Sequence, residues 1–380
     1  MKVALVHKKY TTHGGTERYL VGLSKFLVKN NHQVHVFTAS IDPECRDEKI
    51  NFHQVSAWGK HLGIDKYTFS KNVKKELKKY DFDIIQTFSR VGFGDVIRIG
   101  GGCHQIFLDK YFNSLENPLY KLKKKIEYKL SLQDYFTRYY EAQDFKKGNY
   151  KKIVAVSQMV KNEIIANYHV PPADIIVNHN GVDIGKFNPG NREEYRREIR
   201  KKHEIANDDF MILFLGTGFK RKGLKYIIKA LPDIPKIKLM VVGRGNIKRY
   251  RKLAAEFSVL DRTVFVGPIK NVEAYYAAAD IFVFPSIYDP CANVTLEAMA
   301  SGLPVITSES NGASDVINHG KNGYILDSAD DTHDIKKYIK FLIDNKILNE
   351  FSKKSRCTML DYSKEKNYQK MLDIYRDIDR

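Results

Sequence analysis

Short apolar segments that alternate with helix-like segments recur in two rounds along this chain. The apolar segments are residues 3–6, 34–37, 83–85, 153–156 and 175–177 in the first round, then 211–215, 239–242, 264–266, 281–284 and 304–307 in the second. Between the first two segments, Leu20, Leu23 and Leu27 recur at the spacing of one helix face. Alternating strands and helices predict an α/β fold with doubly wound, largely parallel sheets.

A charged stretch, residues 188–209, separates the two rounds and is poor in large apolar side chains. A chain of 380 residues is also longer than one hydrophobic core usually serves. We therefore expect two Rossmann-like domains that face a cleft, residues 1–185 and residues 186–361. The last segment, about 362–380, is amphipathic, and we expect it to pack back on the first domain as a helix.

Composition excludes several classes of protein. Hydrophobic residues make up 43% of the chain, which is typical of a folded globular protein. No apolar run approaches the roughly 20 residues that span a bilayer, and the start of the chain turns polar too soon for a secretory signal. The four cysteines stand far apart without metal-site spacing, so we expect a reduced, cytoplasmic protein.

The chain carries 63 Lys and Arg against 45 Asp and Glu, a formal charge of +18, which predicts attraction to anionic partners. Residues 110–152 hold much of this excess, interleaved with Tyr and Phe. Within them, five apolar residues share one predicted helix face: Leu115, Leu119, Leu122, Ile126 and Leu130. A basic amphipathic helix suits an anionic membrane surface. Alternatively, the stripe packs on the first domain; nucleic acid is less favoured because no recognised binding motif accompanies the charge.

A glycine-containing loop, residues 216–224, follows one predicted strand and precedes a helix. Its backbone amides and the helix dipole can meet an anion, and Arg221 and Lys222 add donors suited to a diphosphate. The alternative is a basic surface loop that caps a helix. The Walker pattern is absent and the dinucleotide glycine pattern is incomplete, so neither an ATPase nor a dehydrogenase is well supported.

The strand at 281–284 leads through a turn into a helix that we expect to begin near Asn293. The free amides of that first turn can bind phosphate oxygens. Asp289 in the turn can accept hydrogen bonds from sugar hydroxyls, and Glu297 can accept from the two hydroxyls of a ribose. Taken singly, each carboxylate could instead be a helix-start residue stabilised by the dipole; their spacing across the helix start favours the binding site.

These motifs together resemble the retaining family-4 glycosyltransferases of the GT-B fold. The resemblance covers most of the chain. One of its motifs is an acidic residue (Asp289) separated by seven residues from a Glu (Glu297), which is followed by Ala-Met-Ala-Ser-Gly-Leu-Pro. Residues 13–18 (His-Gly-Gly-Thr-Glu-Arg) are similar to the family's glycine loop, residues 180–183 to its interdomain signature, and residues 221–223 to its diphosphate-binding pair. Within the family, Gly-Phe-x-Arg-Lys-Gly and the Tyr-rich basic insert are most similar to members that glucosylate lipopolysaccharide core.

The resemblance implies a role for each matching residue of the second domain. Arg221 and Lys222 would hold the donor diphosphate and stabilise it as it leaves. The backbone at Asn293 and Val294 would bind phosphate or sugar, and Glu297 would bind the ribose.

It also implies roles for Gly14 and Gly15, whose missing side chains would let the backbone approach the diphosphate. Asp289 would contact the donor sugar, although the family usually has Glu there. His104 would bind the donor sugar or orient the acceptor, as in some relatives, or would be structural.

The family further implies that residues 1–185 bind the acceptor and that residues 186–361 bind the nucleotide sugar. It also implies retention of anomeric configuration, a nucleotide-sugar donor as substrate, and no metal or other cofactor. We expect UDP-glucose as the donor and a lipid-linked glycan such as lipopolysaccharide core as the acceptor, at the cytoplasmic membrane face. The alternatives are GDP-mannose or UDP-N-acetylglucosamine as donor, a sugar-nucleotide epimerase or hydrolase of the same fold, and a non-catalytic basic binding protein.

Overall fold

A computed structural model describes residues 1–379 and divides into two compact units. The first unit is Met1–His179 with Asn367–Arg380, and the second is Asn180–Lys366. The division therefore falls after residue 179 rather than 185, and the segment that returns to the first unit begins at 367 rather than near 362. The charged stretch 188–209, predicted to mark the boundary, lies within the second unit and contains α7 (Arg192–Lys202).

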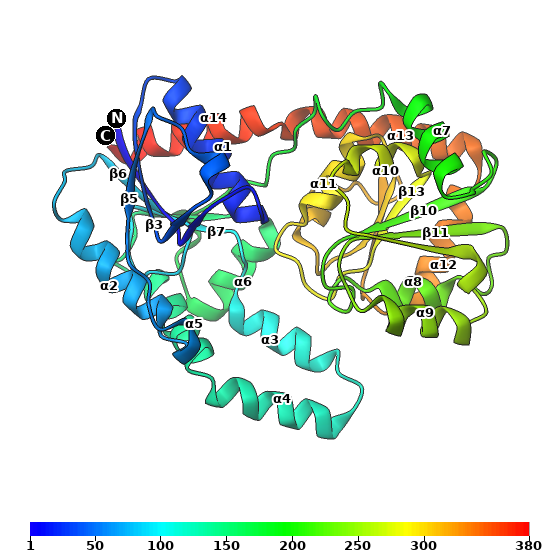
Figure 1. The fold of residues 1–380 in the computed structure, drawn as a ribbon, viewed down its shortest axis with the longest axis horizontal. Helices are drawn as coiled ribbons and strands as arrows, with labels where there is room; N and C mark the ends of the chain where they lie inside the picture. Colours follow the sequence, from blue (N-terminus) through cyan, green and yellow to red (C-terminus); the bar gives the residue numbers. More distant parts are fainter. Residues whose placement is uncertain (380) are drawn as a thin grey trace. The chain divides into compact units, whose positions relative to one another are not determined.

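A seven-stranded parallel sheet forms the centre of the first unit, in the order β5-β3-β1-β6-β7-β8-β9 (Figure 1). Its strands are β1 (Lys2–Val6), β3 (Gln33–Thr38), β5 (Ile50–Gln54), β6 (Ile84–Thr87), β7 (Val96–Ile99), β8 (Lys152–Ala155) and β9 (Ile175–Val177). A small parallel pair joins β2 (Lys9–Tyr10) to β4 (Ser40–Ile41). Most residues of the central strands are apolar because helices cover both faces of the sheet; Gln86, Thr87 and Arg98 are the buried polar exceptions in β6 and β7.

The helices of this unit are α1 (Gly15–Lys29), α2 (Asp65–Leu77), α3 (His104–Asn113), α4 (Pro118–Leu130), α5 (Leu132–Asp144) and α6 (Gln158–Tyr168). The C-terminal helix α14 (Lys364–Asp379) adds its buried residues Met371, Leu372 and Tyr375 to the same core as Leu20 and Leu23 of α1. Residues from both ends of the chain therefore complete one hydrophobic core.

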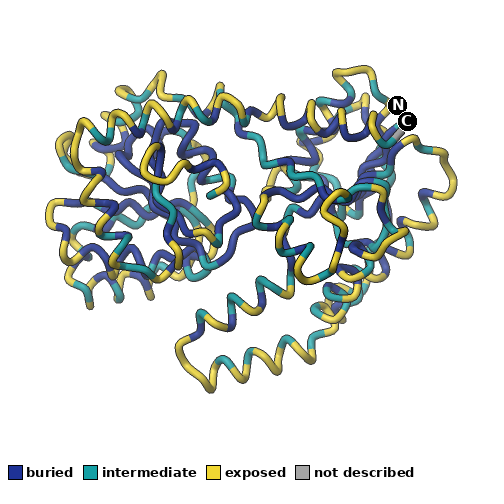
Figure 2. Tube along the Cα trace, turned by 180° about the vertical axis from the view of Figure 1, so that it is seen from behind, coloured by how far each residue is buried: buried dark blue, intermediate teal, exposed yellow. Residues whose placement is uncertain are grey.

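The second unit has a six-stranded parallel sheet in the order β12-β11-β10-β13-β14-β15. Its strands are β10 (Phe210–Leu215), β11 (Ile237–Val242), β12 (Thr263–Gly267), β13 (Ile281–Phe284), β14 (Val305–Ser308) and β15 (Gly323–Leu326). Its further helices are α8 (Leu224–Ala230), α9 (Ile247–Glu256), α10 (Val272–Ala278), α11 (Asn293–Ala300), α12 (Thr332–Leu342) and α13 (Asn345–Met359). Figure 2 shows the central strands as buried segments between more exposed helices.

The predicted α/β class with two doubly wound parallel sheets is confirmed. The predicted apolar segments omit three strands of the two large sheets, β5, β7 and β15, and both strands of the small pair, β2 and β4. In β7 the buried Arg98 interrupts the apolar run, and its guanidinium lies 3.7 Å from the centre of the Tyr19 ring. β5 and β15 are the outer strands of their sheets, where fewer apolar residues are needed.

Helices α3 and α4 form a hairpin that projects from the first unit (Figure 1). The predicted single apolar face over residues 115–130 is wrong in one respect, because α3 ends at Asn113 and a new helix begins at Pro118, capped by Asn117. Leu115 lies between the two helices and is buried with Leu108 and Phe112. No residue of α4 itself is buried, as the exposed hairpin in Figure 2 shows.

Candidate functional site

The loop after β10 places Arg221 and Lys222 beside the carboxyl end of the second sheet. Gly223 makes this possible: its φ is +79°, and a Cβ there would lie 1.9 Å from the carbonyl oxygen of Pro285. Only glycine fits such a crossing. The Arg221 Nη1 atom donates to the carbonyl of Tyr288 over 2.8 Å, which holds the loop against the segment after β13.

Asp289 lies against both predicted cations. Its carboxylate pairs with the buried Lys222 ammonium, and its Oδ2 atom is 3.5 Å from Nη1 of Arg221. Burial and the neighbouring Arg221 lower the pKa of Lys222, whereas the Asp289 carboxylate favours its charged form. The structure thus brings together the two residues predicted to bind the diphosphate and the residue predicted to bind the donor sugar.

Helix α11 begins at Asn293, as predicted, and presents its first turn to the same region. Within residues 1–379, no side chain caps this turn. Asn180 fixes the approach instead, since its Nδ2 atom donates to the Cys291 carbonyl over 3.0 Å and to Asn293 Oδ1 over 2.8 Å. An α-helix N-terminus of this kind, at Asn293 and Val294, is suited to phosphate.

Glu297 is buried in α11, and its position is set by a residue that the sequence did not indicate. The Tyr276 hydroxyl donates to Glu297 Oε2 over 3.0 Å and contacts the Val294 carbonyl at 3.2 Å. Tyr276 belongs to α10, about twenty residues earlier, and is itself buried. Nothing in the local motif around Glu297 points to this tyrosine.

Asn311 is a second residue that sequence reasoning missed. Its fully buried side chain accepts from the backbone of Ala292 over 3.1 Å and donates to the hydroxyls of Thr295 and Thr307, each over 3.0 Å. It also follows β14 at the carboxyl end of the sheet, where ligands of such folds bind. That position was the only signal for it.

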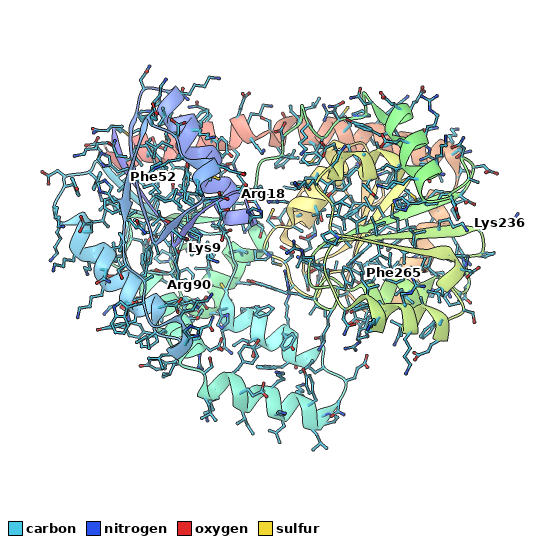
Figure 3. The ribbon with its side chains drawn as sticks, viewed as in Figure 1. Lys9, Arg18, Phe52, Arg90, Lys236 and Phe265 are labelled. Atoms are coloured by element: carbon cyan, nitrogen blue, oxygen red, sulfur yellow. The ribbon has the colours of Figure 1, made fainter. Side chains whose placement is uncertain are left out.

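In the first unit, Gly14 immediately precedes α1, and Gly15 is the first residue of that helix. Gly14 is the residue before α1 with φ +115°, and a Cβ there would lie 2.2 Å from the Glu17 carboxylate. The Arg18 side chain, labelled in Figure 3, donates from Nε to the Gly14 carbonyl over 3.3 Å. The tight glycine turn is present, and its predicted contact with a diphosphate stays a prediction.

His104 begins α3 and is held by two carboxylates. Its backbone amide donates to Glu141 Oε2 over 2.8 Å, and its Nε2 lies 2.8 Å from Asp134 Oδ1. Burial lowers the pKa of His104, and the hydrogen bond with Asp134 opposes that shift. The neutral ring therefore donates from Nε2 to Asp134 and offers Nδ1 as an acceptor.

Glu141 belongs to a buried ionic cluster at the base of the hairpin. Its carboxylate lies 2.5 Å from Nη2 of Arg90 and accepts from the Tyr168 hydroxyl. Arg90 is labelled in Figure 3. Asp144 on the same helix accepts from the Gly92 amide over 2.7 Å, and burial raises the pKa of Asp144 to about 7. These residues anchor α3 and α5 to the sheet, and no sequence motif marked them.

The apolar face of α4 is exposed, so the alternative in which it packs on the first unit is wrong. The exposed fractions are 79% for Leu119, 57% for Leu122, 50% for Ile126 and 77% for Leu130. Apolar side chains gathered on one exposed helix face mark an interaction surface. None of the helices within residues 1–379 has the length and hydropathy needed to cross a bilayer.

Two family models match the chain, one over each unit. The model for Glycosyltransferase Family 4 matches residues 13–186, and that for Glycosyl transferases group 1 matches residues 195–358. With two parallel-sheet domains and the cluster of Arg221, Lys222, Asp289 and Glu297 described, the chain belongs to the family-4 glycosyltransferases of the GT-B fold and is an enzyme of that class.

Similar proteins agree with this assignment. An uncharacterized glycosyltransferase of Methanocaldococcus jannaschii is 27% identical over 85% of this chain and 84% of its own. The lipopolysaccharide glucosyltransferase WaaG of Escherichia coli is 24% identical over 86% of this chain and 85% of its own.

The fold also resembles solved structures. A crystal structure of WaaG has a TM-score of 0.79 at 21% identity, covering 98% of this chain and 99% of that one. Anabaena HepE in complex with UDP-glucose has a TM-score of 0.75 at 16% identity, covering 99% of this chain and 100% of that one. At these identities the structural likeness supports the fold.

Proposed function

We propose that the protein transfers glucose from UDP-glucose to a lipid-linked glycan, such as lipopolysaccharide core, at the cytoplasmic face of the membrane. The observation that carries the donor half is the cluster in the second unit. There, the buried Lys222, the partly exposed Arg221, two carboxylates and the N-terminus of α11 lie around one end of the sheet. WaaG, named a lipopolysaccharide glucosyltransferase, and HepE, solved with UDP-glucose, favour this donor and acceptor.

The donor diphosphate would lie between the Arg221–Lys222 pair and the first turn of α11. Lys222 would then exchange its partner Asp289 for a phosphate, which frees the carboxylate to accept from sugar hydroxyls. Glu297 would accept from the ribose with the oxygen geometry that Tyr276 fixes. Gly14 and Gly15 would bring backbone amides to the same diphosphate.

The cations and the helix N-terminus would stabilise the negative charge that develops on the departing diphosphate. A donor phosphate oxygen would take the proton of the acceptor hydroxyl as it attacks the same face that the diphosphate leaves, so that configuration is retained. We propose that no divalent ion takes part, because Arg221 and Lys222 supply the positive charge. Full activity in EDTA is expected, and loss of activity that Mg²⁺ restores would contradict this.

The membrane half of the proposal rests on α4. Leu119, Leu122, Ile126 and Leu130 are exposed on one side of the helix, and Lys123, Lys125 and Lys129 lie nearest to that side. Such a helix would lie in the interface of an anionic bilayer with its apolar side buried among acyl chains. This would place the enzyme beside a lipid-linked acceptor.

Nucleotide release from a panel of donors, with and without acceptor, tests the transfer. We expect UDP release from UDP-glucose that increases when lipopolysaccharide core acceptor is added. Release that does not depend on acceptor would favour a hydrolase, and a preference for GDP-mannose or UDP-N-acetylglucosamine would replace the donor. Absence of binding to any donor would support the non-catalytic alternative.

A further inference from the structure

A polar groove in the first unit lies between α2, α3, α4 and α5 and has a volume of about 490 Å³. Sites for small molecules commonly have volumes of about 300–1,000 Å³. Its lining combines charged, amide, hydroxyl and aromatic side chains: Lys66, His104, Phe107, Lys124, Glu127, Tyr128, Ser131, Gln133, Asp134 and Thr137.

The charges of this groove are balanced. Lys124 pairs with Glu127 at 2.6 Å, and Asp134 holds the His104 ring at 2.8 Å. Lys66 meets the neutral hydroxyl of Thr137, and burial lowers the pKa of Lys66 to about 8. Two ammonium groups and two carboxylates thus offer both donors and acceptors with little net charge.

A balanced set of this kind suits a ligand rich in hydroxyls more than an anion. Each hydroxyl both donates and accepts, so it can bind a carboxylate and an ammonium group at once. A phosphate, in contrast, would be repelled by Glu127 and Asp134. Phe107 and Tyr128 line the groove with aromatic rings, against which the apolar face of a pyranose can pack.

The groove and the apolar face of α4 lie on opposite sides of that helix. Residues 124, 127 and 128 share one side of this helix, because three- and four-residue spacings align side chains. At about 100° per residue, Leu122 and Ile126 lie on the opposite side. The groove is therefore separated from the apolar face by about one helix diameter, roughly 10 Å.

We propose that this groove binds a neutral sugar ring of the acceptor glycan. The proposal rests on the proposed function, whose lipid-linked acceptor would pass from the membrane beside α4 to the groove. Glu127 and Asp134 accept from ring hydroxyls, Lys66 and Gln133 donate to them, and Tyr128 contacts the apolar face of the ring. His104 Nδ1 is one further acceptor.

Ligand-observed NMR of the full chain with methyl α-glucoside, galactoside and mannoside tests this groove. We expect at least one of them to bind with a millimolar Kd that rises at least about tenfold in Lys66→Met/Asp134→Asn. Gln133→Ala, a change at an exposed position, should weaken the same glycoside without altering the melting temperature. Lys71→Met, on the same helix as Lys66 but outside the groove, should leave binding unchanged.

Three results would overturn the proposal. The first is that none of the three glycosides binds at millimolar concentration, and the second is that the groove variants bind them as the native chain does. The third is that glucose 6-phosphate binds more than about tenfold tighter than the glucoside, since this would identify an anion site. UDP affinity, measured in the same variants, should equal that of the native chain. Loss of UDP binding in the native chain would instead contradict the proposed transferase.

Discussion

The donor cluster of the second unit and the α3–α4 hairpin of the first unit differ in what they bury: the donor cluster buries paired charges, whereas the hairpin exposes apolar side chains. The donor cluster consists of Arg221, Lys222, Asp289 and Glu297; the last three are buried, Arg221 is partly exposed, and each meets another charge or a hydroxyl. In the hairpin, α4 has no buried residue and exposes its apolar side chains. The first arrangement is suited to holding a small ligand in one geometry, whereas the second leaves an apolar surface that a larger partner could cover. Single substitutions should therefore affect chemistry in one region and association in the other.

The largest effect is expected for Lys222→Met. Removal of a positive group beside the leaving diphosphate should lower kcat by about 100- to 1,000-fold. It also leaves Asp289 buried without its ammonium partner, which should cost about 3 kcal/mol of unfolding free energy. Steady-state kinetics and urea unfolding measure the two effects.

The double variant Lys222→Met/Asp289→Asn separates them. It removes the uncompensated carboxylate, so stability should recover while kcat stays low. If activity recovers together with stability, the pair is structural and the donor-cluster interpretation fails.

A smaller effect is expected for Glu297→Gln, which keeps the shape but loses the charge that accepts from the ribose. Hydrogen bonds to charged groups contribute about 1.5–3 kcal/mol, so the Kd for UDP-glucose should rise roughly 10- to 100-fold by calorimetry. Tyr276→Phe should weaken binding by less than about tenfold, because it removes only a neutral donor that orients the carboxylate. Liposome binding should be unchanged in both; native donor affinity in Glu297→Gln would exclude the ribose role.

The hairpin responds differently to Leu122→Asn/Ile126→Asn. Both side chains are at least half exposed, so the unfolding free energy should change by less than about 0.5 kcal/mol. Sedimentation with anionic liposomes should fall by about tenfold or more, because each apolar side chain contributes roughly 1.5–3 kcal/mol when buried. The buried Leu108→Ala is the matched contrast: it should lose about 2–5 kcal/mol of stability. Equal recovery of the native chain on anionic and neutral liposomes would contradict the electrostatic part.

The donor cluster was predictable because its residues fall in two short motifs at the carboxyl ends of parallel strands. Arg221, Lys222, Asp289 and Glu297 required only the positions of those strands and of one helix start. The residues that hold this cluster in position were not predictable in the same way. Tyr276 and Asn311 reach the site by tertiary folding, and a local pattern carries no signal for a partner that is distant along the chain.

The hairpin was predictable in its amphipathic character but not in its surroundings. A 3.6-residue period shows that one side of a helix is apolar, and it is the same for a buried face and an exposed one. The sequence analysis missed the break between α3 and α4 because the apolar periodicity continues through it from Leu115. Asn117 and Pro118, which form a helix start, were the local signal for this break. The buried cluster of Arg90, Glu141 and Asp144 had no pattern at all, since its members come from separate segments.

That cluster gives an effect that is seen only when the pH changes, and it lies where the exposed hairpin joins the buried core. Asp144 has a folded-state pKa of about 7, above its unfolded value of about 3.9. Between these values the folded chain holds more protons than the unfolded chain, so this carboxyl makes stability fall as the pH rises from about 4 to 7. Asp144→Asn retains an acceptor for the Gly92 amide and removes the titration.

Urea unfolding of both chains at several pH values isolates the contribution of Asp144. Relative to the native chain, the variant should gain stability with rising pH, by up to about 1 kcal/mol per pH unit and only below pH 7. A constant difference across this range would mean that the carboxyl is ionised like an exposed one. The base of the hairpin would then resemble the donor cluster, where a charged carboxylate is balanced by its cation, and the contrast between the two regions would lie in α4 alone.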